Sequence, residues 1–171
     1  MSALANKITI HHTAGKYTPN AIERNCYHYL IDANGKITKG VYTLADNIDC
    51  KDGKYARHCG GGNTKNIGIA FCANLGLSEK TLKTNYPLTR PQLEAGFKLA
   101  AELSIKYGIP ISADKIFTHY EFDRRKREPE GKIDIIYLPP FPFVRRDEVG
   151  NFIRSKIKWY ANHFTGAYHL I

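Results

Sequence analysis

The sequence predicts a single α/β domain in which a mixed β-sheet is flanked by helices. Segments with strand-like and helix-like patterns alternate along the chain, which is typical of this class. The length of 171 residues fits one domain over positions 1–171 and leaves no room for a separate binding module. Hydrophobic residues make up 43% and aromatic residues 12% of the chain, so it can form a core. This composition excludes a disordered polycation, despite a net charge of +9.

The first half of the chain is expected to supply most of the sheet. Residues 7–13 (KITIHHT) alternate apolar and polar side chains, which predicts a strand with one buried face. Residues 27–32 and 36–42 flank Asn34-Gly35, a pair that favours a tight two-residue hairpin turn between two antiparallel strands. Residues 66–74 are apolar and β-rich, and are predicted to form a central strand.

Two helices and one further strand are expected in the second half. Thr89 and Gln92 fit a capping box that opens a helix, and Gly108 and Pro110 end it. A short strand at 116–119 follows and ends in His119, and a basic, turn-rich segment occupies 123–132. A last amphipathic helix is expected at about 147–163, with its apolar residues at helical spacing.

The overall charge and the chain ends restrict the classes of function. Lys and Arg exceed Asp and Glu by 25 to 16, which favours an anionic partner. No segment reaches the roughly 18–20 apolar residues of a membrane-spanning helix. Residues 1–7 lack the hydrophobic region of a signal peptide, so we expect synthesis in the cytoplasm.

The four cysteines leave two readings open. Their spacing fits neither a zinc ribbon nor a dense disulfide framework. Cys50 and Cys59 flank a short loop and can pair under oxidising conditions, whereas free thiols are expected in a reducing compartment.

Histidines at two predicted strand ends suggest a metal site. Because side chains alternate along a strand, His12 shares the core face of Ile8 and Ile10, and His11 faces the other side. His11, His119 and Asp134 together would form a two-histidine, one-carboxylate set of the kind that binds catalytic zinc. Spacing alone does not distinguish this set from hydrogen-bonded structural histidines, so both interpretations stay open here.

Five motifs occur in an order that resembles a known enzyme family. They are residues 10–14 (IHHTA), 27–35 (YHYLIDANG), 63–69 (NTKNIGI), 118–121 (THYE) and 131–134 (GKID). In this order they resemble the type 2 N-acetylmuramoyl-L-alanine amidases, a family that includes phage lysozymes of the amidase kind and peptidoglycan recognition proteins. The motifs cover residues 8–134, most of the chain.

The resemblance implies roles for individual residues. His11, His119 and Asp134 map to the ligands of one catalytic Zn²⁺, Tyr27 maps to the catalytic tyrosine, and Lys132 maps to a residue that stabilises the transition state.

The resemblance also implies contacts around the metal site. His58 matches a histidine that lies beside the substrate, and Asn63 is expected to contact substrate through its amide. The long helix that the family has before the tyrosine is expected to shrink to about one turn at 19–24.

The implied function is cleavage of the amide between N-acetylmuramic acid and L-alanine in peptidoglycan. We expect a monomeric phage or prophage endolysin that reaches the cell wall after release through a holin-like pore or lysis. The alternatives are a peptidoglycan-recognition protein without catalysis, a cytoplasmic enzyme that recycles anhydro-muropeptides, and an exported toxin. Nucleic acid is not an expected partner, because acidic residues dilute the cationic run at 124–127 and no nucleic-acid motif occurs. The last helix is also a candidate for contact with anionic membranes.

Overall fold

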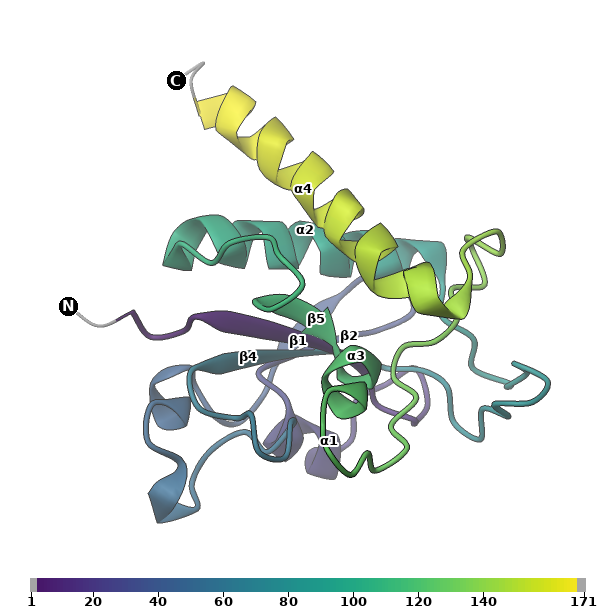
Figure 1. Ribbon diagram of the computed structural model, residues 1–171, viewed down its shortest axis with the longest axis horizontal. Coiled ribbons are helices and arrows are strands. Elements are labelled where there is room, and N and C mark those ends of the chain that lie inside the picture. The colour runs from purple at the N-terminus through teal and green to yellow at the C-terminus, as the bar shows by residue number, and fades with distance from the viewer. Residues whose placement is uncertain (1–2, 169–171) are drawn as a thin grey trace.

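The computed structural model describes residues 3–168 and confirms an α/β domain built on one mixed five-stranded sheet (Figure 1). The strand order is β3-β2-β4-β1-β5. The strands are β1 (Lys7–His12), β2 (Tyr29–Ile31), β3 (Ile37–Lys39), β4 (Asn66–Phe71) and β5 (Ile116–Thr118). Only the pairing of β2 with β3 is antiparallel, and the other three pairings are parallel. Positions 1, 2 and 169–171 of the expected domain lie outside the described residues.

Within residues 3–168, four α-helices flank the sheet. They are α1 (Ala21–Cys26), α2 (Arg90–Tyr107), α3 (His119–Arg124) and α4 (Val149–Tyr168), and 3₁₀ turns lie at Ala45–Asn47, Cys50–Asp52 and Arg146–Glu148. Helices α2 and α4 pack together across one face of the sheet, and α1 and α3 lie on the other side (Figure 1). The predicted capping box of Thr89 and Gln92 opens α2, and Gly108 ends it in the left-handed conformation.

The alternation of β1 separates two environments within the fold. Ile8 and Ile10 join the main hydrophobic core beneath α2 and α4. Thr9 and His11 point to the opposite face, where both are fully buried and hydrogen-bonded. The pattern therefore identifies the two faces correctly. Neither face is solvated, because β1 lies between β4 and β5 and both sides of the sheet are covered.

The hairpin between β2 and β3 differs from the expected two-residue turn. Asp32 and Lys36 close a three-residue loop, in which the Gly35 amide donates to the Asp32 carbonyl and the Asp32 amide to the Lys36 carbonyl. Gly35 has a φ of +88°, whereas Asn34 is not in the positive-φ region. This is the pattern of a turn closed by a glycine bulge. The Asp32 carboxylate stabilises it by accepting the amides of Asn34 and Lys36.

Several predicted boundaries shift for local reasons. The short first helix occupies Ala21–Cys26 because Asn20 and Glu23 form its capping box. His119 does not end the strand but begins α3, since Thr118 is the N-cap. The last helix starts at Val149 and continues to Tyr168, beyond the predicted end at 163.

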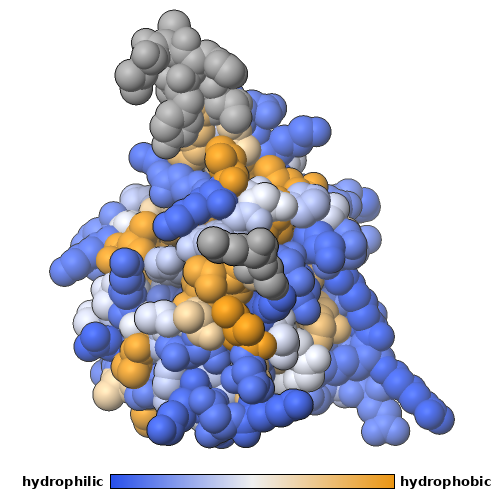
Figure 2. Space-filling model, turned by 90° about the vertical axis from the view of Figure 1, so that its left-hand side faces the viewer, coloured by the Kyte–Doolittle hydropathy of each residue, from blue (hydrophilic) through white to orange (hydrophobic). Residues whose placement is uncertain are grey.

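The surface is largely hydrophilic on the side shown in Figure 2, with small separate apolar areas. None of the helices within residues 3–168 has the length and apolarity needed to cross a membrane. All four cysteines are free, so Cys50 and Cys59 are not paired in this structure.

Candidate metal centre

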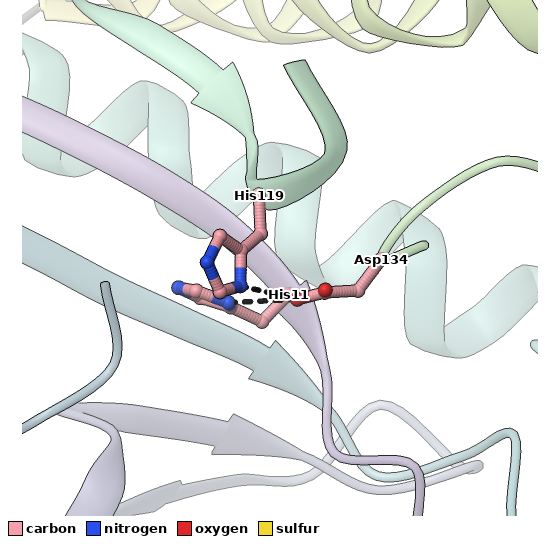
Figure 3. A group of neighbouring side chains, drawn as sticks. All are labelled: His11, His119 and Asp134. Carbon is pink, nitrogen blue, oxygen red and sulfur yellow. Dashed lines mark hydrogen bonds and ion pairs between the residues drawn. The ribbon is translucent and has the colours of Figure 1, made fainter. Parts of the chain in front are cut away.

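Three side chains that are far apart in the sequence meet beside the sheet. His11 comes from the end of β1, His119 from the first residue of α3, and Asp134 from the loop that follows (Figure 3). The Asp134 Oδ2 atom lies 2.8 Å from His11 Nδ1 and 3.2 Å from His119 Nδ1. All three residues are buried, and their ligand atoms lie within 4.8 Å of one another. The structure thus brings together the three residues that the sequence singled out.

Burial and contact set the charge states of this group. Burial lowers the pKa of His11 to about 4, although the hydrogen bond and charge of Asp134 act in the opposite direction. Burial alone would raise the pKa of Asp134, but its contacts with His11 and His119 outweigh burial and hold that pKa well below its usual range. Asp134 is therefore an ionised carboxylate at neutral pH.

His58 decides which nitrogen of His11 carries the proton. His58 Nε2 lies 2.9 Å from the Asn66 carbonyl oxygen, which only accepts, so Nε2 carries hydrogen. Burial keeps the pKa of His58 well below its usual value, so the ring is neutral and its Nδ1 is an acceptor. His11 Nε2 lies 3.0 Å from that Nδ1 and must donate to it. The Nδ1 of a neutral His11 consequently has a free lone pair.

With the His11 proton on Nε2, a lone pair on His11 Nδ1 faces a lone pair on Asp134 Oδ2. His11 Nδ1 and the Asp134 carboxylate oxygen are both acceptors, yet they lie 2.8 Å apart. Such a contact is unfavourable unless a proton or a cation lies between the two atoms. Ligands bound to tetrahedral zinc at 2.0–2.1 Å lie about 3.3 Å from each other, close to the 2.8 and 3.2 Å that separate Asp134 Oδ2 from His11 Nδ1 and His119 Nδ1. The donor set and its spacing therefore fit a zinc ion.

A glycine makes room for His58 against the sheet. A Cβ atom on Gly68 of β4 would lie 2.6 Å from His58 Cγ, closer than any ordinary contact. His58 is buried, and both of its ring nitrogens bond within the protein. The predicted contact of His58 with substrate stays a prediction, while the geometry shows it supporting His11.

Tyr27 lies next to the three-residue group. Its ring centroid is 5.1 Å from that of His11, with the planes tilted by 53°. Burial, helped by the charge of Asp134, raises the pKa of Tyr27 well above its usual value. The phenol therefore stays protonated at neutral pH and can donate a hydrogen bond.

Lys132 and Asn63 are placed less directly than the sequence suggested. The Lys132 side chain is 44% exposed, and its ammonium lies 3.7 Å from a Glu130 carboxylate oxygen. The Asn63 side chain accepts the Cys59 amide within the glycine-rich turn. Their roles toward substrate stay predictions.

Sequence reasoning missed the supporting residues around the centre. Asn66 and Gly68 were assigned to a strand and to the motif at 63–69 without roles of their own, although they hold His58 in place. The T-x-x-E pattern at 118–121 is a capping-box signal that is visible in the sequence. This capping box fixes the start of α3, of which His119 is the first residue. His28, by contrast, bonds the Asn47 side chain and accepts the Gly68 amide within the buried interior.

Comparisons with known proteins concern the family and the fold of the chain. A family model described as N-acetylmuramoyl-L-alanine amidase matches residues 2–131. No curated protein sequence gives a significant match.

Solved structures share the fold at low sequence identity. The amidase LysC from Clostridium intestinale URNW is 18% identical, with a TM-score of 0.56 over 91% of this chain and 87% of its own. The PlyG catalytic domain is 18% identical, with a TM-score of 0.55 over 92% and 82%. The endolysin of the Thermus scotoductus MAT2119 bacteriophage Ph2119 is 17% identical, with a TM-score of 0.51 over 76% of each chain.

Proposed function

The chain belongs to the N-acetylmuramoyl-L-alanine amidase family, and we propose that it is a zinc-dependent hydrolase of peptidoglycan. The bond cleaved would be the amide between N-acetylmuramic acid and the L-alanine of the stem peptide. One observation supports this proposal above the others. The acceptor atoms His11 Nδ1 and Asp134 Oδ2 face each other in a buried group that also contains His119.

His11, His119 and Asp134 would hold the metal. An ionised carboxylate and neutral imidazoles are the forms that bind zinc, and burial already favours the neutral form of His11. When bound, zinc supplies Lewis acidity, which lowers the pKa of water toward about 7 and polarises a carbonyl. The hydrogen bond from His11 Nε2 to His58 keeps the His11 ring in the orientation that directs Nδ1 at Asp134.

Two further residues are proposed to act on the substrate. Tyr27, protonated and beside His11, would donate a hydrogen bond to an oxygen of the reacting amide. Lys132, two positions before Asp134, would stabilise negative charge on that oxygen after leaving Glu130. Loss of the Lys132 charge in Lys132→Met should lower kcat more than it raises KM.

The proposal is tested by the chemical groups that appear during digestion of purified cell walls. Amide cleavage releases new amino termini of L-alanine and no new reducing sugar ends. We expect this product from the wild type and from Asp147→Ala, a control at an exposed acid outside the centre, but not from Asp134→Ala or His119→Ala. New reducing ends would show that a glycosidic bond is cut and would refute the amidase proposal.

We further propose that the enzyme acts as an endolysin, made in the cytoplasm and released to the wall through a pore. Support comes from structures of the same fold that are described as endolysins and from the charge of +9, which favours binding to anionic cell walls. Expression in bacteria should cause lysis only together with a pore-forming protein. Lysis-free growth with both proteins, or equal lysis without the pore, would contradict this role.

A further inference from the structure

We propose that Arg154 of α4 is a positioning residue that holds His119 in place for metal binding. This inference rests on the proposed metal centre, but it concerns a part of the chain beyond the matched family region, which ends at residue 131. Sequence reasoning gave this helix only core packing or membrane contact.

Arg154 is buried, and both of its terminal nitrogens are hydrogen-bonded. Its Nη1 donates to the Ile116 carbonyl at 3.0 Å and to Glu121 Oε2 at 2.9 Å. Its Nη2 donates to Glu121 Oε1 at 2.8 Å and to Asn151 Oδ1 at 2.7 Å. The two-pronged contact with Glu121 is the geometry that makes arginine–carboxylate pairs directional. Arg154 thus joins α4 to both β5 and α3.

Glu121 connects this contact to the metal centre. Its Oε2 accepts the Thr118 amide at 2.9 Å, and the Thr118 hydroxyl accepts the Glu121 amide at 3.1 Å. His119 is the first residue of the helix that this capping box opens. A helix of six residues has little stability of its own, so its orientation depends on such outside contacts. Arg154 therefore acts on His119 through Glu121.

The close approach of α4 also depends on Gly150. A Cβ atom there would lie 2.0 Å from Glu121 Oε1, so any larger residue would displace the carboxylate. Gly150 and Arg154 lie one turn apart on the helix and both touch Glu121. The surface-exposed pair of Arg145 and Glu148 has no such connection to the centre.

The test is the zinc dissociation constant of the metal-free protein, measured by competition with a chromophoric chelator. Arg154→Met keeps much of the side-chain stem and removes the guanidinium. We expect it to bind zinc about 10-fold more weakly, the lower end of the loss seen when a group that hydrogen-bonds a metal ligand is removed, because Arg154 acts through Glu121. Arg145→Met should bind like the wild type.

A second control separates positioning from general destabilisation. Ile157→Ala removes a fully buried side chain of the same helix that packs in the main hydrophobic core, so it lowers Tm. It should leave the zinc affinity of the folded protein within about threefold of wild type, because that core lies on the face of the sheet opposite to His11. Equal weakening in Arg154→Met and Ile157→Ala would overturn the proposal, as would wild-type affinity in a folded Arg154→Met.

Milder variants cover the case in which Arg154→Met does not fold. Arg154→Lys keeps the positive charge but loses the two-pronged contact with Glu121. Glu121→Gln keeps a side-chain oxygen that can accept the Thr118 amide, but it removes the negative charge that pairs with Arg154. Both should bind zinc more weakly than wild type, and unchanged affinity in both would refute the proposal.

If the wild type binds no zinc, the metal proposal is refuted. The effect of Arg154 on the position of His119 is then measured by NMR spectroscopy of the protein without metal. The ring signals of His119 should shift in Arg154→Lys but not in Ile157→Ala, and unchanged signals would refute the positioning role as well.

Discussion

Substitution of Gly68 by alanine tests the packing that supports the metal centre. A Cβ at this position would lie 2.6 Å from His58 Cγ, 2.8 Å from Cδ2 and 3.0 Å from Nδ1. The backbone of Gly68 is in a strand without a positive φ, so alanine is not strained by its own conformation. Any cost must therefore come from the His58 ring.

The expected magnitude follows from these distances. To restore an ordinary contact of 3.4 Å, the ring has to move by about 0.8 Å. A shift of this size stretches a hydrogen bond of 2.9 or 3.0 Å beyond the range of an effective bond. Overpacking costs about 1–3 kcal/mol and the loss of a buried hydrogen bond about 1–3 kcal/mol. We expect Gly68→Ala to lower the free energy of unfolding by about 4 kcal/mol.

A double-mutant cycle checks the cause. Urea unfolding of the metal-free wild type, Gly68→Ala, His58→Ala and the double variant gives the coupling between the two positions. In the His58→Ala background the new methyl group meets no ring, so Gly68→Ala should cost about 0 kcal/mol, and the coupling energy should be about 4 kcal/mol. Equal costs in both backgrounds, or a cost in the wild type below about 0.5 kcal/mol, would refute this account.

Three further predictions concern the core around the centre. Burial lowers the pKa of His28 from 6.5 in the unfolded chain to about 4 in the folded protein, so the unfolded chain takes up the proton first as pH falls. The free energy of unfolding should therefore fall by about 3 kcal/mol between pH 6.5 and pH 4. Denaturant titrations at several pH values check this, and a His28→Gln variant with an unchanged pH dependence would contradict it. Gln92→Leu leaves two buried carbonyls without their donor and should cost about 2–4 kcal/mol by thermal unfolding, whereas a neutral effect would show that these bonds add nothing. Cys59 and Cys72 are buried, and burial raises the pKa of Cys59 to about 11 and that of Cys72 to about 12. Both thiols should therefore resist a thiol reagent at pH 8 until urea is added. Rapid labelling of all thiols in the native state would contradict the burial.

Local patterns predicted the elements of the fold well. The capping box at Thr89 and the period of two in β1 depend on residues that are neighbours in the sequence, and both are confirmed. The prediction of a two-residue hairpin turn was wrong, because the Asp32 carboxylate accepts two amides, those of Asn34 and Lys36, and thereby favours a three-residue loop. Such side-chain contacts compete with the simple preference of an Asn-Gly pair.

The candidate site was predictable only in part. Strand parity pointed to His11, and the ordered motifs added His119 and Asp134, which the structure brings together. The support of this group could not be read from spacing, because His58 reaches it from a separate loop. Its place depends on the absence of a side chain at Gly68, a property that appears only when the two segments are packed.

Titration of the metal-free protein with zinc is the most direct test of the proposal that His11, His119 and Asp134 hold a catalytic zinc ion. Release of L-alanine amino termini from cell walls should be absent without metal and should rise linearly to a maximum at one zinc per chain. Asp134→Ala should show no such rise. Full activity of the metal-free protein, or a rise that is unchanged in Asp134→Ala, would contradict the account.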